Sequence, residues 1–120
     1  MTPSAINLRM QSKVLEIDFG GTRYCLPFEL LRVYSPSAEV RGHGASQEVL
    51  QVGKRNVSIT ALLPVGNYAV QPHFSDGHNT GIFSWDYLYW LGENQTRLWQ
   101  EYLDKLQKAG YRGEAGRDGY

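Results

Sequence analysis

The chain has a single cysteine, no run of lysine and arginine, and no long apolar segment, and each absence excludes a class of protein. Cys25 alone can form neither an intramolecular disulfide nor a thiolate metal cluster within one chain. The 12 Lys and Arg balance the 12 Asp and Glu, which argues against a nucleic-acid partner. No apolar run approaches the roughly 20 residues that span a bilayer, so we expect no membrane protein.

Targeting and catalytic motifs are also missing. The N-terminus lacks a basic segment followed by an apolar one, so we expect no signal peptide and predict a soluble, cytoplasmic protein. No serine-hydrolase elbow, P-loop or HExxH motif occurs, and the sequence therefore predicts no enzyme. A length of 120 residues is enough for one domain with a modest core.

Aromatic residues and strand-like alternation are plentiful. Phe, Trp and Tyr make up 12% of the chain, enough for a large core contribution or an interface. Apolar and polar residues alternate with the period of two that half-buried strands show. This pattern predicts strands near residues 6–10, 14–19, 22–26, 57–63 and 68–74.

One short helix is predicted after the third strand, and two more are predicted near the C-terminus. Pro27 fits the start of a short helix over residues 28–33, because its missing N–H costs nothing there. Ser84 is a plausible N-cap for a second helix over 85–91, which Gly92 ends. A third helix is predicted over 95–109, with Gly110 as the residue that terminates it.

The predicted fold class is α+β, a small antiparallel, strand-rich body with a short helix after Pro27 and two C-terminal helices. Residues 34–56 are expected to form a long loop with a short strand near 49–50. We predict one domain over residues 1–110 and a disordered, Gly-rich and charged tail over 111–120.

The segment around Asp76-Gly77 is where any chemistry would be sought. Asp-Gly between two extended runs favours a two-residue type I′ turn. Such a turn would pair Ser75 with His78, so His73 and His78 would share one face of the hairpin. Asp76 would then lie beside His78 at an exposed tip.

His73, Asp76 and His78 are the one compact set of potential metal ligands, and two interpretations stay open. A His/Asp set can bind zinc or iron, although closed zinc sites usually have four ligands. Alternatively, Asp76 serves the turn and the histidines lie at the surface. His43, between two glycines, and Cys25, without a nearby motif partner, are weaker candidates.

Three parts of the chain resemble the gamma-butyrobetaine hydroxylase-like N-terminal domain family. They read VLEIDF (14–19) with LPFELLR (26–32), PVGNYAV (64–70), and FSDGH (74–78) with GIFSWDYL (81–88). The last part is the most specific, because it combines a turn, a strand and a helix entry at fixed spacing. The resemblance spans roughly residues 6 to 92.

The resemblance implies a zinc ligand at His78. In eukaryotic hydroxylases of this family the domain precedes an iron- and 2-oxoglutarate-dependent catalytic domain and holds a structural zinc with three cysteines and one histidine. The cysteine positions correspond to Ser35, Ser37 and Val40, so the family's zinc ligands are absent here. The chain has no room for the catalytic domain either, so hydroxylase activity is not expected.

We therefore predict a stand-alone, non-catalytic binding or adaptor module for a protein partner. Its predicted binding surface is Asp76, His78, Trp85 and Tyr87. The alternative is a metal-binding accessory protein that uses His78, His73 and Asp76 for zinc or iron. The domain also occurs joined to Mrp-type ATPases of iron–sulfur assembly. This arrangement suggests that the metal-binding alternative would act in iron–sulfur cluster assembly. A small enzyme with an unrecognised site is the third hypothesis.

Overall fold

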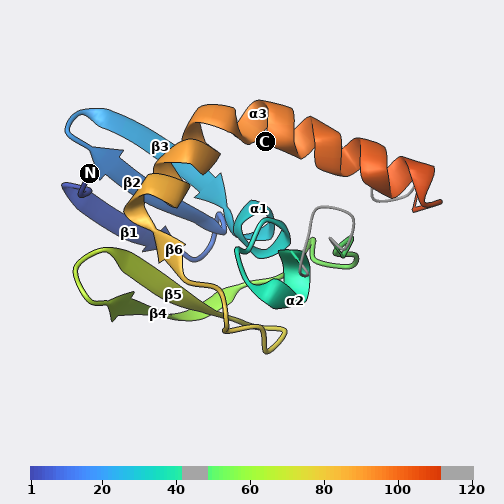
Figure 1. Ribbon diagram of the computed structural model, residues 1–120, viewed down its shortest axis with the longest axis horizontal. Helices are drawn as coiled ribbons and strands as arrows, with labels where there is room; N and C mark the ends of the chain where they lie inside the picture. The colour runs from blue at the N-terminus through green and yellow to red at the C-terminus, as the bar shows by residue number, and fades with distance from the viewer. Residues whose placement is uncertain (42–48, 112–120) are drawn as a thin grey trace.

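The structure is a computed structural model that describes residues 1–41 and 49–111, and it shows the predicted α+β fold. Figure 1 shows two sheets, with α3 passing over the first sheet before it extends beyond it. The elements in chain order are β1 (Ala5–Arg9), β2 (Val14–Phe19), β3 (Thr22–Pro27), α1 (Phe28–Val33), α2 (Ala38–Arg41), β4 (Ile59–Val65), β5 (Ala69–Phe74), β6 (Phe83–Ser84) and α3 (Trp85–Lys108).

The first sheet is antiparallel with the order β1-β2-β3. Its alternation places Leu15 and Ile17 on the buried face, where neither is exposed to solvent. Phe19 pairs with Thr22 across Gly20-Gly21, and both glycines have positive φ, +58° and +107°. This two-residue loop has the positive φ at both central positions that a type I′ turn needs.

The second sheet is an antiparallel meander with the order β4-β5-β6. The two-residue strand β6 pairs only with Ala69 and Val70 of β5. Pro72 lies beyond this pairing, so its missing N–H leaves no gap in the β5-β6 ladder. The break in register between Ile59 and Ala61 marks an irregularity in β4.

Several helix signals are confirmed by the structure. Helix α1 begins directly after Pro27 and occupies the predicted residues 28–33. The Ser84 hydroxyl caps α3 by accepting a hydrogen bond of 3.1 Å from the Tyr87 amide. Gly110, with φ of +93°, follows the end of α3, where a left-handed residue closes the last turn.

The prediction of two C-terminal helices is wrong, because α3 runs without a break from Trp85 to Lys108. Gly92 lies inside this helix, against the Tyr24 ring of β3. A Cβ at residue 92 would fall 2.4 Å from the Tyr24 Cγ. Gly92 therefore permits close packing of the helix on the sheet and does not end the helix.

The predicted long loop contains α2, which the sequence interpretation missed. Residues 49–50 form no strand, contrary to the prediction. The Val49 amide instead donates to the Val40 carbonyl at 2.8 Å, which brings the chain back to α2. His43 and most of the predicted tail, residues 112–120, lie outside the described residues.

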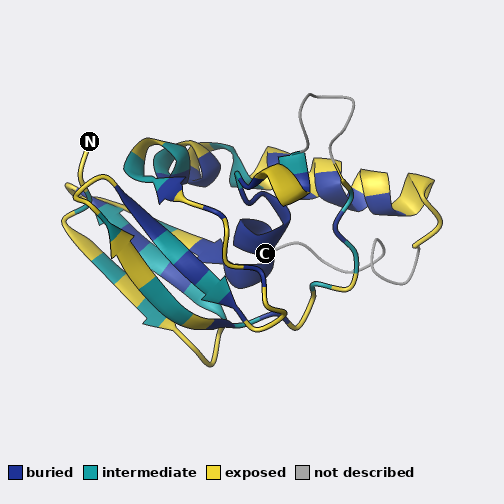
Figure 2. Cartoon of the chain, turned by 60° about the horizontal axis from the view of Figure 1, so that its bottom comes forward, coloured by how far each residue is buried: buried dark blue, intermediate teal, exposed yellow. Residues whose placement is uncertain are grey.

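One buried apolar cluster joins both sheets to α1 and α3. Figure 2 shows the buried residues on the inner sides of the strands and along one side of α3. Among the described residues, no helix is both long and apolar enough to cross a membrane. The core includes Leu15, Ile17, Leu26, Phe28, Leu31, Ile59, Phe83, Leu88, Leu91, Tyr102 and Leu106.

Candidate functional site

The turn at Asp76-Gly77 is a three-residue loop and not the predicted type I′ turn. The Phe74 amide donates to the His78 carbonyl at 2.9 Å, and the Gly77 amide donates to the Phe74 carbonyl at 3.0 Å. Gly77 has φ of +93°, but Asp76 is not among the described non-glycine residues with positive φ. This pattern matches a type I turn that a left-handed glycine extends into a bulge.

The extra loop residue moves His78 to the opposite face of the hairpin. His78 now lies across from Phe74, and the two rings are 5.9 Å apart. Because a slip of one residue turns every side chain to the other face, His78 points inward with Phe74. His73 directly precedes Phe74 in β5, so its side chain lies on the opposite face of the strand. The prediction that His73 and His78 share one face of the hairpin is therefore wrong.

His78 is buried, with 5% of its surface exposed, and both ring nitrogens have partners. Nδ1 lies 3.0 Å from Glu39 Oε2, and Nε2 lies 2.9 Å from Ser35 Oγ. A carboxylate only accepts hydrogen bonds, so the proton of a neutral ring belongs on Nδ1. Nε2 then accepts from the Ser35 hydroxyl.

The surroundings of His78 favour this neutral ring. Burial lowers the pKa of His78 first, and the positive charge of Arg32 lowers it further. The hydrogen bond and charge of Glu39 act in the opposite direction without reversing the shift. The exposed Glu39 side chain is surrounded by water, which weakens its attraction for a proton on the ring.

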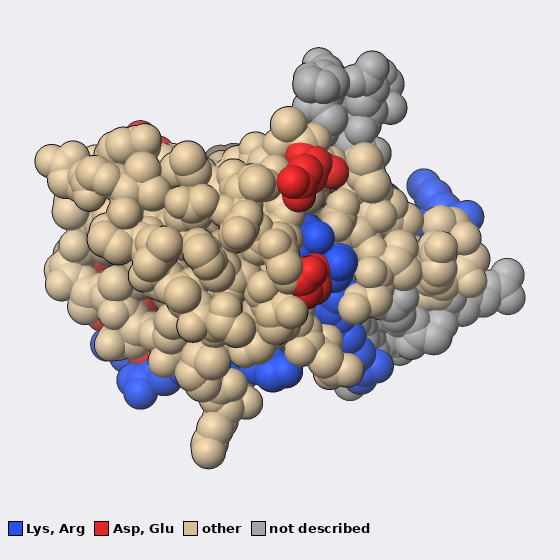
Figure 3. Space-filling model, turned by 90° about the horizontal axis from the view of Figure 1, so that it is seen from below, with Lys and Arg blue, Asp and Glu red and all other residues tan. Residues whose placement is uncertain are grey.

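Asp76 anchors the same loop to the rest of the protein. Its Oδ2 accepts from Arg32 Nε at 2.9 Å and from Lys54 Nζ at 2.6 Å, while Oδ1 accepts from the His78 amide at 3.2 Å. Partial burial raises the pKa of Asp76, but these three donors outweigh it and lower the pKa to about 2. Figure 3 shows such acidic and basic side chains meeting on a face that is otherwise largely uncharged.

The segment between α1 and α2 packs against the residues that follow His78. Ser37 Oγ lies 2.6 Å from Thr80 Oγ1 and also accepts from the Glu39 amide at 3.2 Å, which caps α2. A Cβ on Gly81 would fall 2.2 Å from Ser35 Oγ, so the backbone at Gly81 packs directly against the Ser35 side chain. We call the set Ser35, Ser37, Glu39, His78 and Thr80 the His78 network.

Comparison with known proteins gives a family for this fold and site. The model of the family described as gamma-butyrobetaine hydroxylase-like, N-terminal, matches residues 6–89. The chain belongs to this family. No curated protein is significantly similar to the chain in sequence.

Solved structures agree with the family assignment. Two NMR solution structures are 50% and 51% identical to the chain, with TM-scores of 0.80 and 0.77. They cover 91% and 90% of this chain and 86% and 81% of their own chains. A crystal structure from Acidithiobacillus ferrooxidans, a DUF971 family protein of unknown function, is 46% identical with a TM-score of 0.64. It covers 76% of this chain and 92% of its own.

The His78 network does not fit the zinc site that the hydroxylases of the family hold. The position at Ser35 carries a hydroxyl bonded to His78, the one at Ser37 a hydroxyl bonded to Thr80, and Val40 is a buried apolar side chain. Protein zinc sites use thiolates, imidazoles and carboxylates, and both His78 nitrogens already have partners. Among residues 1–41 and 49–111, no three His, Cys, Asp or Glu side chains are grouped to hold a metal.

The two predicted aromatic binding residues lie on different sides of α3. Trp85 Nε1 donates to the Asn67 carbonyl at 2.8 Å, toward the second sheet. The Tyr87 hydroxyl donates to the Tyr34 carbonyl at the end of α1. Residues two apart on a helix do not face each other, so the structure does not unite the predicted surface of Asp76, His78, Trp85 and Tyr87.

Sequence reasoning did not predict the hydrogen bonds of His78 with Ser35 and Glu39. Ser35 and Glu39 are 43 and 39 residues away from His78 along the chain. A local signal was nevertheless present at Ser37, because serine followed by an acidic residue two positions later is typical of a helix start. That signal predicts α2 and, with it, the placement of Glu39.

Proposed function

We propose that this chain is a non-catalytic module that binds a protein partner through an aromatic surface at the start of α3. The surface consists of Tyr87 and Trp90, whose rings stack, and we call it the Tyr87 surface. Its most telling feature is Trp90, which is 42% exposed on helix α3. Exposed Trp and Tyr side chains are enriched at protein interfaces and supply much of their binding energy.

The Tyr87 surface is held rigid before any partner binds. The Trp90 and Tyr87 rings stack with centroids 5.7 Å apart and planes at 19°. Tyr87 is fixed at its hydroxyl by Tyr34, and its ring contacts Phe83 at 5.9 Å. A preformed aromatic surface loses little conformational entropy on binding, which favours affinity.

The state of the titratable side chains supports a non-catalytic role. A general base needs a free nitrogen or oxygen within reach of its substrate, but His78 is buried and bonded at both ring nitrogens. Asp76 is held by Arg32, Lys54 and the His78 amide. We assign both residues the role of holding the loop beside the Tyr87 surface, and we expect the partner to be met in the cytoplasm.

The experiment compares the partners captured by the wild type, by Trp90→Glu and by Tyr68→Glu. Tyr68 is a matched control, because it is 55% exposed but lies in the turn between β4 and β5. The expected result is one protein retained in stoichiometric amount by the wild type and the control and lost from Trp90→Glu. Loss of a buried interface tryptophan typically costs about 2 kcal/mol or more, roughly thirtyfold in affinity.

The result that would overturn the proposal is equal capture of the same proteins by all three. Circular dichroism and thermal melts accompany the comparison, so that loss of folding is not mistaken for loss of binding. Because Trp90 is exposed, its replacement is expected to leave the fold intact.

A further inference from the structure

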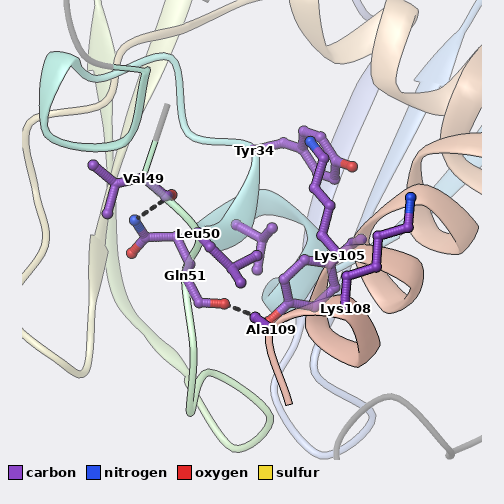
Figure 4. Close-up of a pocket in the computed structure, with 9 residues that line it drawn as sticks. Tyr34, Val49, Leu50, Gln51, Lys105, Lys108 and Ala109 are labelled. Atoms are coloured by element: carbon purple, nitrogen blue, oxygen red, sulfur yellow. Dashed lines mark hydrogen bonds between the residues drawn. The ribbon is translucent and has the colours of Figure 1, made fainter. Parts of the chain in front are cut away.

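We propose that a pocket between α1 and the C-terminal half of α3 binds a small amphipathic anion with an apolar body and one carboxylate. The pocket has a volume of about 450 Å³, within the range of small-molecule sites. Figure 4 shows its lining, which the end of α1, residues 49–51 and the last turns of α3 provide. It is separate from the Tyr87 surface and from the His78 network.

The walls of the pocket are apolar because their polar atoms are already satisfied. The Tyr102 hydroxyl donates to the Gln51 carbonyl at 2.7 Å in a buried hydrogen bond. The Tyr34 hydroxyl donates to the Leu98 carbonyl, also at 2.7 Å. Both phenols therefore present their rings, and not unsatisfied hydroxyls, to the space that Val33 and Leu50 also line. The same bonds fix the positions of the rings, so the pocket does not depend on a ligand for its shape.

The charge of the lining selects the sign of the ligand. Lys105 and Lys108, three residues apart on α3, line the pocket, and none of its lining residues within 1–41 and 49–111 is a carboxylate. Their side chains bring positive charge to the α3 side of a space that Leu50 and Tyr102 also line (Figure 4). An amphipathic anion would bury its apolar body against Leu50 and Tyr102. Its anionic head would then lie near the two lysines. An amphipathic cation or a neutral amphiphile would match only the apolar walls and not the positive charge.

Lysines in the last turn of a helix also complement the negative end of its dipole. The test must therefore separate stabilisation of the helix from binding of an anionic ligand. The dipole role predicts an effect of Lys108 on stability alone. The ligand role predicts an effect on the affinity of an anion in the pocket. Lys108 is exposed, so its substitution is compatible with folding.

The experiment is an NMR titration of the labelled full chain with octanoate, and in parallel with octanol as the neutral analogue. We expect saturable shifts of the amides at Leu50, Gln51 and Tyr102, with weaker binding of octanol. Lys108→Gln should weaken octanoate binding roughly fivefold, the effect of one partly exposed ion pair. The matched control is Arg97→Gln, which removes a cation on α3 that pairs with Glu101 at 2.9 Å. It should leave octanoate binding unchanged.

Three results would each overturn the inference. The first is the absence of saturable shifts at the pocket amides. The second is equal affinity for octanoate and octanol, which would show that the lysines select no charge. The third is equal loss of affinity in Lys108→Gln and Arg97→Gln, which would show a general effect of net charge. None of these results bears on partner capture by the Tyr87 surface, so the two proposals fail separately.

Discussion

At the scale of single residues, His78 shows how hydrogen bonds accommodate a titratable side chain in the core. Its side chain is surrounded by Phe74, Ser35 and Glu39, and each ring nitrogen has one partner. A buried polar group without partners would cost about 1–3 kcal/mol, so these two hydrogen bonds explain why an imidazole is tolerated in the core. These hydrogen bonds suit the neutral imidazole. Because protonation of His78 is disfavoured in the folded state, the stability of the protein should depend on pH.

We predict that the protein loses stability as the pH falls below about 6.5 and that His78 causes part of this loss. The pKa of His78 is lowered in the folded state from its ordinary value of 6.5. Below that value the unfolded chain takes up a proton at His78 more readily than the folded protein, so acid favours unfolding. Urea denaturation at pH 7.5 and 5.5 should show a smaller change in midpoint for His78→Gln than for the wild type.

The control for this pH prediction is His73→Gln, which removes a histidine from the other face of β5 and retains His78. It should keep the pH dependence that His78 provides. An equal pH dependence in His78→Gln and the wild type would contradict the prediction. His78→Gln is itself expected to be less stable at neutral pH, so the comparison uses the change between the two pH values and not the absolute midpoints.

At the scale of secondary structure elements, α3 and the loop after β5 show where local signals mislead. Glycine usually ends helices, yet Gly92 lies inside α3 because the Tyr24 ring occupies the space of a side chain there. Asp-Gly usually forms a two-residue turn, yet here the buried face requires His78 beside Phe74 and adds a residue to the loop. In both places a contact between distant segments outweighs the local preference, and such contacts cannot be read from spacing.

We predict that Gly92→Ala destabilises the protein although alanine favours helices. The gain in helix propensity is about 1 kcal/mol, whereas the new Cβ would fall 2.4–2.7 Å from three atoms of the Tyr24 ring. That ring is itself packed against Phe19 and Tyr89, with centroids 6.4 and 5.6 Å away, so it has little room to move. Overpacking of this kind should cost a net amount of about 1–3 kcal/mol in urea denaturation.

A double-mutant cycle provides the control for Gly92→Ala. In a Tyr24→Ala background the ring is gone, and Gly92→Ala should become neutral or stabilising. The same loss of stability in both backgrounds would show that residue 92 is constrained by its backbone and not by Tyr24.

At the scale of the whole molecule, the strands and the α+β class could be predicted because alternation of apolar and polar residues is a local signal. The division into two three-stranded sheets could not, since it depends on which strands pair across the chain. The resemblance singled out His78 and the positions at Ser35 and Ser37, which the structure brings to one place. It could not show which groups hydrogen-bond to the two ring nitrogens of His78. That conclusion needed the distances from His78 to Ser35 and Glu39.

The fold should therefore keep its full stability without a metal, and this is our last prediction. Its apolar residues form one buried cluster that joins both sheets to α1 and α3, and the loop at His78 is tied to residues 35–39 by side-chain hydrogen bonds. Zinc-dependent domains behave differently, because coordination supplies much of their folding free energy and chelators unfold them. Thermal melts with and without EDTA should superimpose, and zinc-saturated EDTA controls for effects of the chelator itself. A midpoint that falls by many degrees with free EDTA alone would show that a metal holds residues 35–39 to His78.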